Sequence, residues 1–297
     1  MVREKHRHEE LDKVVILFAG DSGDGVQLTG MEFTTASAIA GNETVTLPSF
    51  PSEIRAPAGS IAGVSSYQIQ FGSSLVSTPG DYPDVLVAFN PAALKANLKE
   101  LKKGGILVVN EDAFTKTNLE KVGYDSNPCE DQEIQHEYRV YAIPMSKLCK
   151  AVLKDSGLSP SQIERCKNYF ALGVMLWLFE RPEEALKEEI RKRFKNKALL
   201  AEANLKVLDA GMQYGDTAEL FDTRFKVAQS DLKPGEYRNI NGALAITYGL
   251  LAASEKSGLP LFYAAYPITP ATDIFQELVR FQSPRVLCFQ AEDEISA

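Results

Sequence analysis

The sequence has 297 residues, of which 44% are hydrophobic and 24% charged, with a formal net charge of -8 and a pI near 5.1. This balance is typical of a folded globular protein, and the length favours two structural units. The acidic charge argues against nucleic acid as a partner. The lack of a signal sequence, or of an apolar run near ~18 residues, argues against a membrane and predicts a cytoplasmic protein.

Predicted strands and helices alternate over the first half of the chain. An apolar run at 13–20 predicts a buried strand, the glycine-rich segment GDSGDG follows, and residues 26–40 are predicted to form a helix. Further strands are expected at 45–47, 64–71, 85–89, 106–109 and 138–143, with a helix at 91–103. Such alternation predicts an α/β, Rossmann-like domain built on a doubly wound sheet.

The second half is expected to hold a helical extension, a linker and a second domain. Residues 159–214 have helical patterning and complete a first domain at 1–214. Residues 215–239 lose periodicity and contain DLKPGEYRN, which indicates a linker. The domain at 240–297 is predicted to contain helix, strand, helix and strand at 241–257, 259–265, 271–281 and 285–290. This is only the N-terminal part of an α/β domain, so the chain is expected to be C-terminally truncated.

Two segments of the first domain could bind an anion. In GDSGDG, Gly20, Gly23 and Gly25 would let backbone N–H groups face a ligand at the start of a helix. The spacing GxxGxG differs, however, from the dinucleotide fingerprint GxGxxG, and two aspartates add negative charge. Arg55, in the loop SFPSEIRAPAGS, could grip a carboxylate or a phosphate. A structural turn and a solvent-exposed arginine are the competing interpretations.

Two segments of the second domain follow predicted strands. In YPITP, Pro267 and Pro270 hold Thr269 at the carboxyl end of a strand, where ligands bind in open α/β sheets. Pro270 also suits the first position of the next helix, and a plain strand-to-helix turn is the alternative. AEDEISA places three carboxylates after the last strand, and by residue type alone they are interpreted as the charged start of a helix.

The cysteines and histidines form no recognisable metal or nucleophilic site. Cys129, Cys149, Cys166 and Cys288 are widely separated, without a CxxC pair, and are predicted to be free buried thiols. The histidines at 6, 8 and 136 provide no Ser/His/Asp arrangement, and the first two are interpreted as part of a solvated tail. No metal ligand is therefore predicted.

Taken together, five segments resemble the α subunit of 2-oxoglutarate:ferredoxin oxidoreductases, in which a γ-like domain is fused in front of the pyrimidine-binding domain of a thiamine diphosphate enzyme. They are FAGDSGDGVQLTG, LPSFPSEIRAPAGSIAGVSSYQI, DVLVAFNPAALKANL, GEYRNINGALAITYGLLAA and YPITPATDIFQEL. The resemblance covers almost the whole chain. It implies oxidative decarboxylation of a 2-oxoacid, expected to be 2-oxoglutarate, with coenzyme A to an acyl-CoA, carbon dioxide and reduced ferredoxin.

The resemblance also implies roles for individual residues. Glu294 is similar to the glutamate that hydrogen-bonds the aminopyrimidine ring of thiamine diphosphate and promotes its imino tautomer. Thr269 is expected to reach the substrate and the cofactor with its hydroxyl. Three residues are expected to shape the wall of that site: Tyr266, Pro267 and Pro270. Three more are candidates for contacts with coenzyme A: Gly23, Gly25 and Arg55.

The resemblance places the remaining cofactors on a partner. Thiamine diphosphate is expected to be shared with a β subunit that holds Mg²⁺ and a [4Fe-4S] cluster, because this sequence has neither a suitable GDG-plus-Asn signature nor clustered cysteines. The GDG at 23–25 follows the first strand of the γ-like domain and is not that signature. The chain alone is therefore predicted to be inactive.

Two alternatives stay open. A stand-alone nucleotide- or acyl-binding module would show no thiamine dependence. An NAD-dependent dehydrogenase would use the glycine loop, although its spacing and the lack of an identifiable acidic ribose partner disfavour this. These residues do not decide between 2-oxoglutarate, pyruvate and branched 2-oxoacids as substrates.

Overall fold

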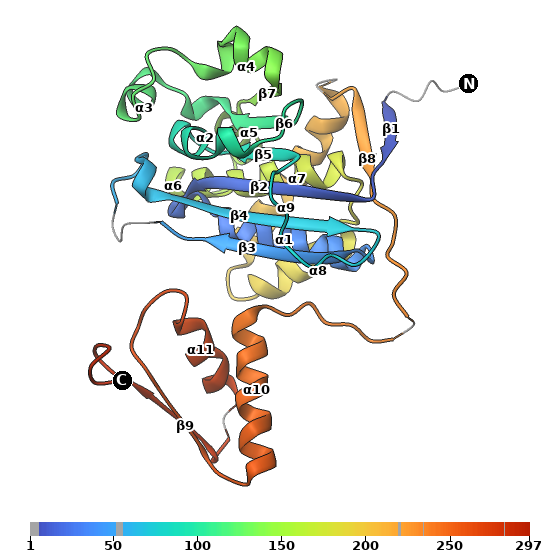
Figure 1. Cartoon of the computed structure of the whole chain (residues 1–297). Helices are drawn as coiled ribbons and strands as arrows, with labels where there is room; N and C mark the ends of the chain where they lie inside the picture. The colour runs from blue at the N-terminus through green and yellow to red at the C-terminus, as the bar shows by residue number, and fades with distance from the viewer. Residues whose placement is uncertain (1–5, 52–55, 219–220, 234, 282) are drawn as a thin grey trace. The chain divides into compact units, whose positions relative to one another are not determined.

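The computed structural model describes residues 6–51, 56–218, 221–233, 235–281 and 283–297 (Figure 1). The chain divides into two compact units, Met1–Lys233 and Pro234–Ala297, which are described separately. The division falls inside the segment predicted as a linker. Among the described residues, no helix is both long and apolar enough to cross a membrane.

The first unit is built on a six-stranded sheet in the order β3-β4-β2-β5-β6-β7. β4 runs antiparallel to both of its neighbours, whereas β2, β5, β6 and β7 are parallel. The predicted α/β class is confirmed, with one antiparallel strand added to the doubly wound pattern. The bounds are β2 Lys13–Asp21, β3 Glu43–Ser49, β4 Val64–Gly72, β5 Val85–Ala88, β6 Ile106–Asn110 and β7 Arg139–Ile143.

Helices cover both faces of this sheet, and so the parallel strands are apolar on both sides (Figure 1). In β2, for example, Ile16 and Phe18 belong to one buried cluster and Leu17 to the other. The first cluster is completed by α1 Val26–Ile39, α5 Met145–Val152, α7 Lys167–Leu178, α8 Glu184–Arg193 and α9 Ala198–Thr217. The second is completed mainly by α2 Pro91–Asn97 and α3 Lys116–Lys121, with α4 Gln132–Glu137 beside them.

The remaining elements of the first unit are short. The helix α6 spans Pro160–Arg165 and begins with a capping box formed by Ser159 and Gln162. The single-turn 3₁₀ helices are η1 Ser22–Asp24, η2 Ile61–Gly63, η3 Leu98–Glu100, η4 Glu111–Ala113 and η5 Pro128–Glu130.

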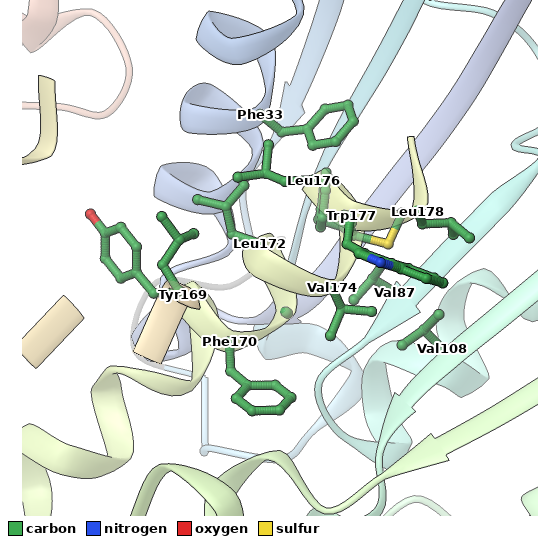
Figure 2. Close-up of a cluster of buried hydrophobic side chains, with 14 of the residues drawn as sticks. Phe33, Val87, Val108, Tyr169, Phe170, Leu172, Val174, Leu176, Trp177 and Leu178 are labelled. Atoms are coloured by element: carbon green, nitrogen blue, oxygen red, sulfur yellow. The ribbon is translucent and has the colours of Figure 1, made fainter. Parts of the chain in front are cut away.

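The most buried helix is α7, whose twelve residues are all buried. Figure 2 shows its apolar side chains between Phe33 of α1 and the sheet residues Val87 and Val108. On its other side, α7 packs closely against α9 at Gly173 and Gly211. A Cβ atom on Gly173 would collide with the Leu208 carbonyl oxygen, and one on Gly211 with the Phe170 carbonyl oxygen. The two glycines therefore allow the backbones of the two helices to approach.

This contact predicts a stability effect. Replacing Gly211 by alanine is expected to cost about 2 kcal/mol, because the added methyl group must push two buried helices apart. The melting temperature should fall by roughly 4–8 °C for a unit of this size. A matched control is Gly249→Ala, since Gly249 lies in a helix with open space around it, and the change should be neutral or slightly stabilising. Equal melting temperatures for the two variants would contradict the close contact.

The structure corrects the predicted linker, and it shows that part of the predicted solvated tail forms a strand whose residues are exposed. β1 (Arg7–Glu10) pairs in parallel with β8 (Thr223–Lys226), inside the segment predicted as a linker. The α9 helix also continues to Thr217, beyond the predicted domain end at 214. Phe225 is buried, and His6 Nδ1 donates a hydrogen bond to the Phe221 carbonyl oxygen (2.9 Å). His8 Nδ1 lies 2.7 Å from the Glu180 carboxylate. Both ends of the first unit are thus held by a pairing between residues distant in sequence.

The second unit has two helices and two parallel strands among its described residues. They are α10 Gly242–Ser257, β9 Leu261–Ala265, α11 Thr272–Arg280 and β10 Val286–Gln290. The Asn241 side chain caps the start of α10, and Gly258, in the left-handed region, ends it. All four elements were predicted in this order. One face of the strand pair leaves Phe262, Leu287 and Phe289 exposed.

Candidate functional sites

The carboxyl ends of the parallel strands in the first unit surround a polar cavity of about 350 Å³. Asp21 ends β2, Asn90 follows β5, Asn110 ends β6 and Ser146 follows β7, and all four line it. The crevice outside the carboxyl ends of parallel strands is the usual ligand position in open α/β sheets. The sheet therefore positions a candidate site at the edge where the glycine loop begins.

One hydrogen-bond network joins the acidic side chains of this cavity. Asp21 accepts hydrogen bonds from the Gly59 backbone N–H (2.7 Å) and from the Asn90 amide (3.1 Å). Asn90 also donates to Asp24 (3.2 Å), whose other oxygen lies 2.9 Å from the Lys167 ammonium. Asp21 therefore connects the end of β2 to the loop that contains Gly59.

The network continues from Lys167 to the far side of the cavity. The Lys167 ammonium lies 3.1 Å from Glu164, which accepts a hydrogen bond from the Ser146 hydroxyl (2.7 Å). The Asn110 amide donates to Ser146 (3.4 Å). The side-chain amide oxygen of Asn110 is buried and has no hydrogen-bond partner among the described residues, which leaves one acceptor for a ligand.

Charge and burial oppose each other in this network. Burial raises the pKa of Asp21 above its ordinary value, against the hydrogen bond from Gly59. Burial alone would lower the pKa of Lys167, but the adjacent Asp24 and Glu164 outweigh it, so that the net pKa is raised and the ammonium stays charged. Burial alone would raise the pKa of Glu164, but the hydrogen bond from Ser146 and the charge of Lys167 outweigh it, so that the net pKa is lowered. An acceptor-rich cavity of this kind suits a hydrogen-bond donor better than a phosphate.

The glycine loop separates this polar cavity from a second one. Gly25 has a φ of 75°, a left-handed conformation that favours glycine, and it leads directly into α1. Gly23 and Gly25 line a second cavity of about 520 Å³. Asp21 and Asp24, by contrast, line the polar cavity. The negative charge of the two aspartates argued against anion binding at this loop. These aspartates, however, line a different cavity from the one lined by Gly23 and Gly25.

In the second unit, the two predicted segments follow paired strands. β9 and β10 are parallel with Ala265 opposite Gln290, so both strands end at the same edge. Thr269 comes four residues after β9 and Glu294 four residues after β10, and both are exposed. Parallel pairing thus brings the two chain segments to one edge of the strand pair.

The other predicted residues of this edge are also exposed or half-buried. Tyr266 is half-buried, and Pro267 and Pro270 are exposed. The Thr269–Pro270 peptide bond is cis. The predicted first helical position for Pro270 is wrong, because α11 begins at Thr272. The carboxylates do not start a helix among the described residues. Instead, Asp293 accepts hydrogen bonds from Ser296 in a turn.

Sequence reasoning missed most of the polar network and could not place every predicted residue. Arg55 lies outside the described residues, although Ala58 and Gly59, from the same loop, line the polar cavity. Glu164 and Lys167 were not predicted, since they lie in a helical segment without a recognisable motif. A signal for Asn90 and Asn110 exists, because Asn110 is the last residue of an apolar strand and Asn90 comes two residues after another.

The cysteines are consistent with inert thiols. Cys129, Cys149 and Cys166 are buried as predicted, whereas Cys288 is half-buried. Burial raises the pKa of Cys129 to about 12 and that of Cys166 to about 11, so neither is a thiolate near neutral pH. In the part of the chain that the structure describes, no group of three or more His, Cys, Asp or Glu side chains could hold a metal ion.

Comparison with known proteins identifies one family. Residues 15–214 match the family model of pyruvate ferredoxin/flavodoxin oxidoreductase. The chain is 49% identical over 287 residues to the 2-oxoglutarate oxidoreductase subunit KorA of Mycobacterium tuberculosis, covering 97% of this chain and 44% of that protein. It is 28% identical over 211 residues to the ketoisovalerate oxidoreductase subunit VorA of Methanothermobacter marburgensis, covering 69% of this chain and 37% of that protein.

A solved structure supports the same relationship. The 2-oxoglutarate:ferredoxin oxidoreductase from Magnetococcus marinus, with 2-oxoglutarate, coenzyme A and succinyl-CoA bound, matches with a TM-score of 0.70 and 30% identity. The match covers 96% of this chain and 44% of that one. The α/β fold of this chain thus agrees with the fold of that enzyme. The chain belongs to the pyruvate ferredoxin/flavodoxin oxidoreductase family, which confirms the predicted resemblance, and it spans less than half the length of these curated relatives.

Proposed function

We propose that this chain is part of the α subunit of a 2-oxoacid:ferredoxin oxidoreductase that acts on 2-oxoglutarate. The proposed reaction is oxidative decarboxylation with coenzyme A to an acyl-CoA, carbon dioxide and two electrons for ferredoxin. The observation that carries the proposal is the 49% identity to a 2-oxoglutarate oxidoreductase subunit over 97% of this chain. The common strand edge of Thr269 and Glu294 supports it.

The second unit is proposed to hold the pyrimidine part of thiamine diphosphate. The donor set fits this ring, because the Glu294 carboxyl can accept or donate a hydrogen bond and the Thr269 hydroxyl can do both. When bound, thiamine diphosphate supplies the nucleophilic carbon for decarboxylation. Glu294 would hold a proton at the ring nitrogen, and Thr269 would orient the substrate. Tyr266, Pro267 and Pro270 would form the adjoining wall.

The first unit is proposed to contribute to coenzyme A binding. Gly23 and Gly25 are exposed or half-buried and line a cavity at the start of α1, where backbone N–H groups favour an anion. Arg55 is the third proposed contact, although it lies outside the described residues. The related Magnetococcus marinus enzyme has coenzyme A bound.

A β subunit is proposed to complete the enzyme. It would share thiamine diphosphate with this chain and provide Mg²⁺ and the [4Fe-4S] cluster that passes electrons to ferredoxin. The charge distribution and cysteine spacing of this chain offer no such cluster site in the sequence.

The proposal is tested with the complete α subunit produced together with its β subunit. Reduction of ferredoxin, or of methyl viologen in its place, is followed with 2-oxoglutarate, pyruvate and 2-oxoisovalerate, each with and without coenzyme A. We expect coenzyme-A-dependent reduction with 2-oxoglutarate that is lost on removal of thiamine diphosphate. Turnover with pyruvate or 2-oxoisovalerate alone would correct the substrate. Thiamine-independent ligand binding without turnover would instead favour the stand-alone binding module.

A further inference from the structure

The second cavity beside the glycine loop combines an apolar lining with a positive rim. It has a volume of about 520 Å³, within the range of small-molecule sites. Leu158, Phe194, Leu199 and Leu200 form much of its apolar lining. Gly23 and Gly25, proposed above as contacts of coenzyme A, line the same cavity, whereas these four apolar side chains have no role in that proposal.

The charged side chains that line this cavity are both positive. Arg165 and Lys197 line it, and no aspartate or glutamate is among its described lining residues, although the whole chain has 40 acidic and 32 basic residues. Both cations are exposed, and neither forms an ion pair within the described parts of the chain. An anion in the cavity would therefore meet two unpaired positive charges.

Two helices also begin at this cavity. α1 starts directly after Gly25, and the first turn of α9, at Ala198 and Leu199, lines the cavity. The start of α9 at Lys197 has no side-chain cap. The first backbone N–H groups of a helix have no partner within the helix, and they favour negative charge. The two helix N-termini and the two cations thus all favour a negatively charged group in this cavity.

A buried hydroxyl points independently to a ligand. Tyr169 is 2% exposed, lines the cavity, and its hydroxyl has no hydrogen-bond partner among the described residues. Figure 2 shows this hydroxyl directed away from the other labelled side chains of the apolar cluster. Burial, and then the nearby Glu32, raise the pKa of Tyr169, so the group remains a hydrogen-bond donor. A buried polar group without a partner is unfavourable, and a ligand acceptor would relieve this.

We propose that this cavity binds an amphipathic organic anion. Its anionic head would lie by Arg165, Lys197 and the helix ends, and its apolar body would lie against the leucines and Phe194, within reach of Tyr169. Two sources share this chemistry: an acyl carboxylate, and the phosphopantetheine arm of coenzyme A. The second source rests on the coenzyme A contacts proposed above for Gly23 and Gly25, whereas binding of an amphipathic anion requires neither turnover nor thiamine diphosphate.

The test uses the 297-residue chain and isothermal titration calorimetry with octanoate, 4′-phosphopantetheine, inorganic phosphate and octanol. We expect a dissociation constant of about 0.1–1 mM for at least one amphipathic anion. Binding of octanoate alone assigns an acyl carboxylate, and binding of 4′-phosphopantetheine alone assigns the coenzyme arm. Phosphate or octanol binding as tightly as these would overturn the amphipathic site, as would no binding by either anion at about 5 mM.

Variants locate the binding to this cavity. The double variant Arg165→Gln/Lys197→Gln should weaken binding about tenfold or more, because both charges at the rim are lost. Tyr169→Phe removes only the hydroxyl and should weaken it about fivefold. The matched control is Arg191→Gln/Lys206→Gln, which removes the same charge at exposed positions that do not line the cavity. Equal affinity in the double variant and the control would refute the assignment, whatever the outcome of the turnover assay.

Discussion

Replacing Glu294 by glutamine in the assembled enzyme is expected to lower kcat for 2-oxoglutarate oxidation by roughly 10²–10⁴-fold. Glutamine keeps the shape and hydrogen-bonding capacity of the side chain but cannot carry a titrating proton. The role proposed for Glu294 depends on that proton, so shape alone should not preserve activity. The measurement is steady-state reduction of methyl viologen with 2-oxoglutarate and coenzyme A at saturating thiamine diphosphate.

The control for this prediction lies two residues away. Glu292 is also an exposed carboxylate after β10, and Glu292→Gln should stay within about twofold of the wild type. Because Glu294 is exposed, its substitution should leave the melting temperature unchanged within the error of a surface change. If both variants keep full activity, Glu294 is not the proton-holding residue. If both lose it equally, charge at this edge matters rather than one carboxyl.

The parts of the fold that sequence could predict are those with a local pattern. The strands of the sheet in the first unit are apolar on both faces, and so their β-branched runs stand out, as in β2 and β6. The second unit was predicted well because α10 and α11 are separated by clear breakers, including Gly258 and the YPITP turn. Apolar runs and helix-breaking residues are thus sufficient to predict the order of these helices and strands along the chain.

What could not be predicted depends on contacts between distant residues. β1 is the polar sequence RHEE, which forms a strand only because β8 pairs with it across more than two hundred residues. Short helices such as α3 and α4 have six residues each, too few for a periodic apolar face. The starts of these two helices are instead fixed by the N-cap side chains of Thr115 and Asp131.

The candidate sites divide in the same way. The sequence predicted that Thr269 and Glu294 each follow the end of a strand. That the two segments lie at the same edge follows only from the parallel pairing of β9 and β10. Lys167 could not be found, since a lysine at the start of an apolar helix normally faces solvent. The fold buries it because two carboxylates, from η1 and α6, are close enough to compensate its charge.

Replacing Lys167 by methionine is expected to destabilise the first unit by about 3 kcal/mol. The Lys167 side chain is 11% exposed and lies 2.9 Å from Asp24, whose side chain is 14% exposed. Removing the ammonium leaves the buried Asp24 carboxylate without compensation, although methionine fills much of the same volume. The melting temperature, measured by circular dichroism at neutral pH, should fall by roughly 6–12 °C.

The dependence on pH has a definite sign. The pKa of Lys167 is raised in the folded chain, so its contribution is fully present below the ordinary lysine value and is lost only as the pH rises through the folded pKa. The pKa of Glu164 is lowered, so its contribution is present above the ordinary glutamate value and is lost as the pH falls. The difference between wild type and Lys167→Met should therefore be constant around pH 7 and shrink in acid.

A second substitution distinguishes lost charge compensation from lost packing. In Lys167→Met/Asp24→Asn, the uncompensated carboxylate is gone while an amide oxygen can still accept from Asn90, so about half of the lost stability should return. The exposed pair Lys116 and Glu120 provides the surface control, because Lys116→Met should cost at most about 0.5 kcal/mol. If the double variant is no more stable than Lys167→Met, the lysine acts by packing, and the network is not what holds the strand ends together.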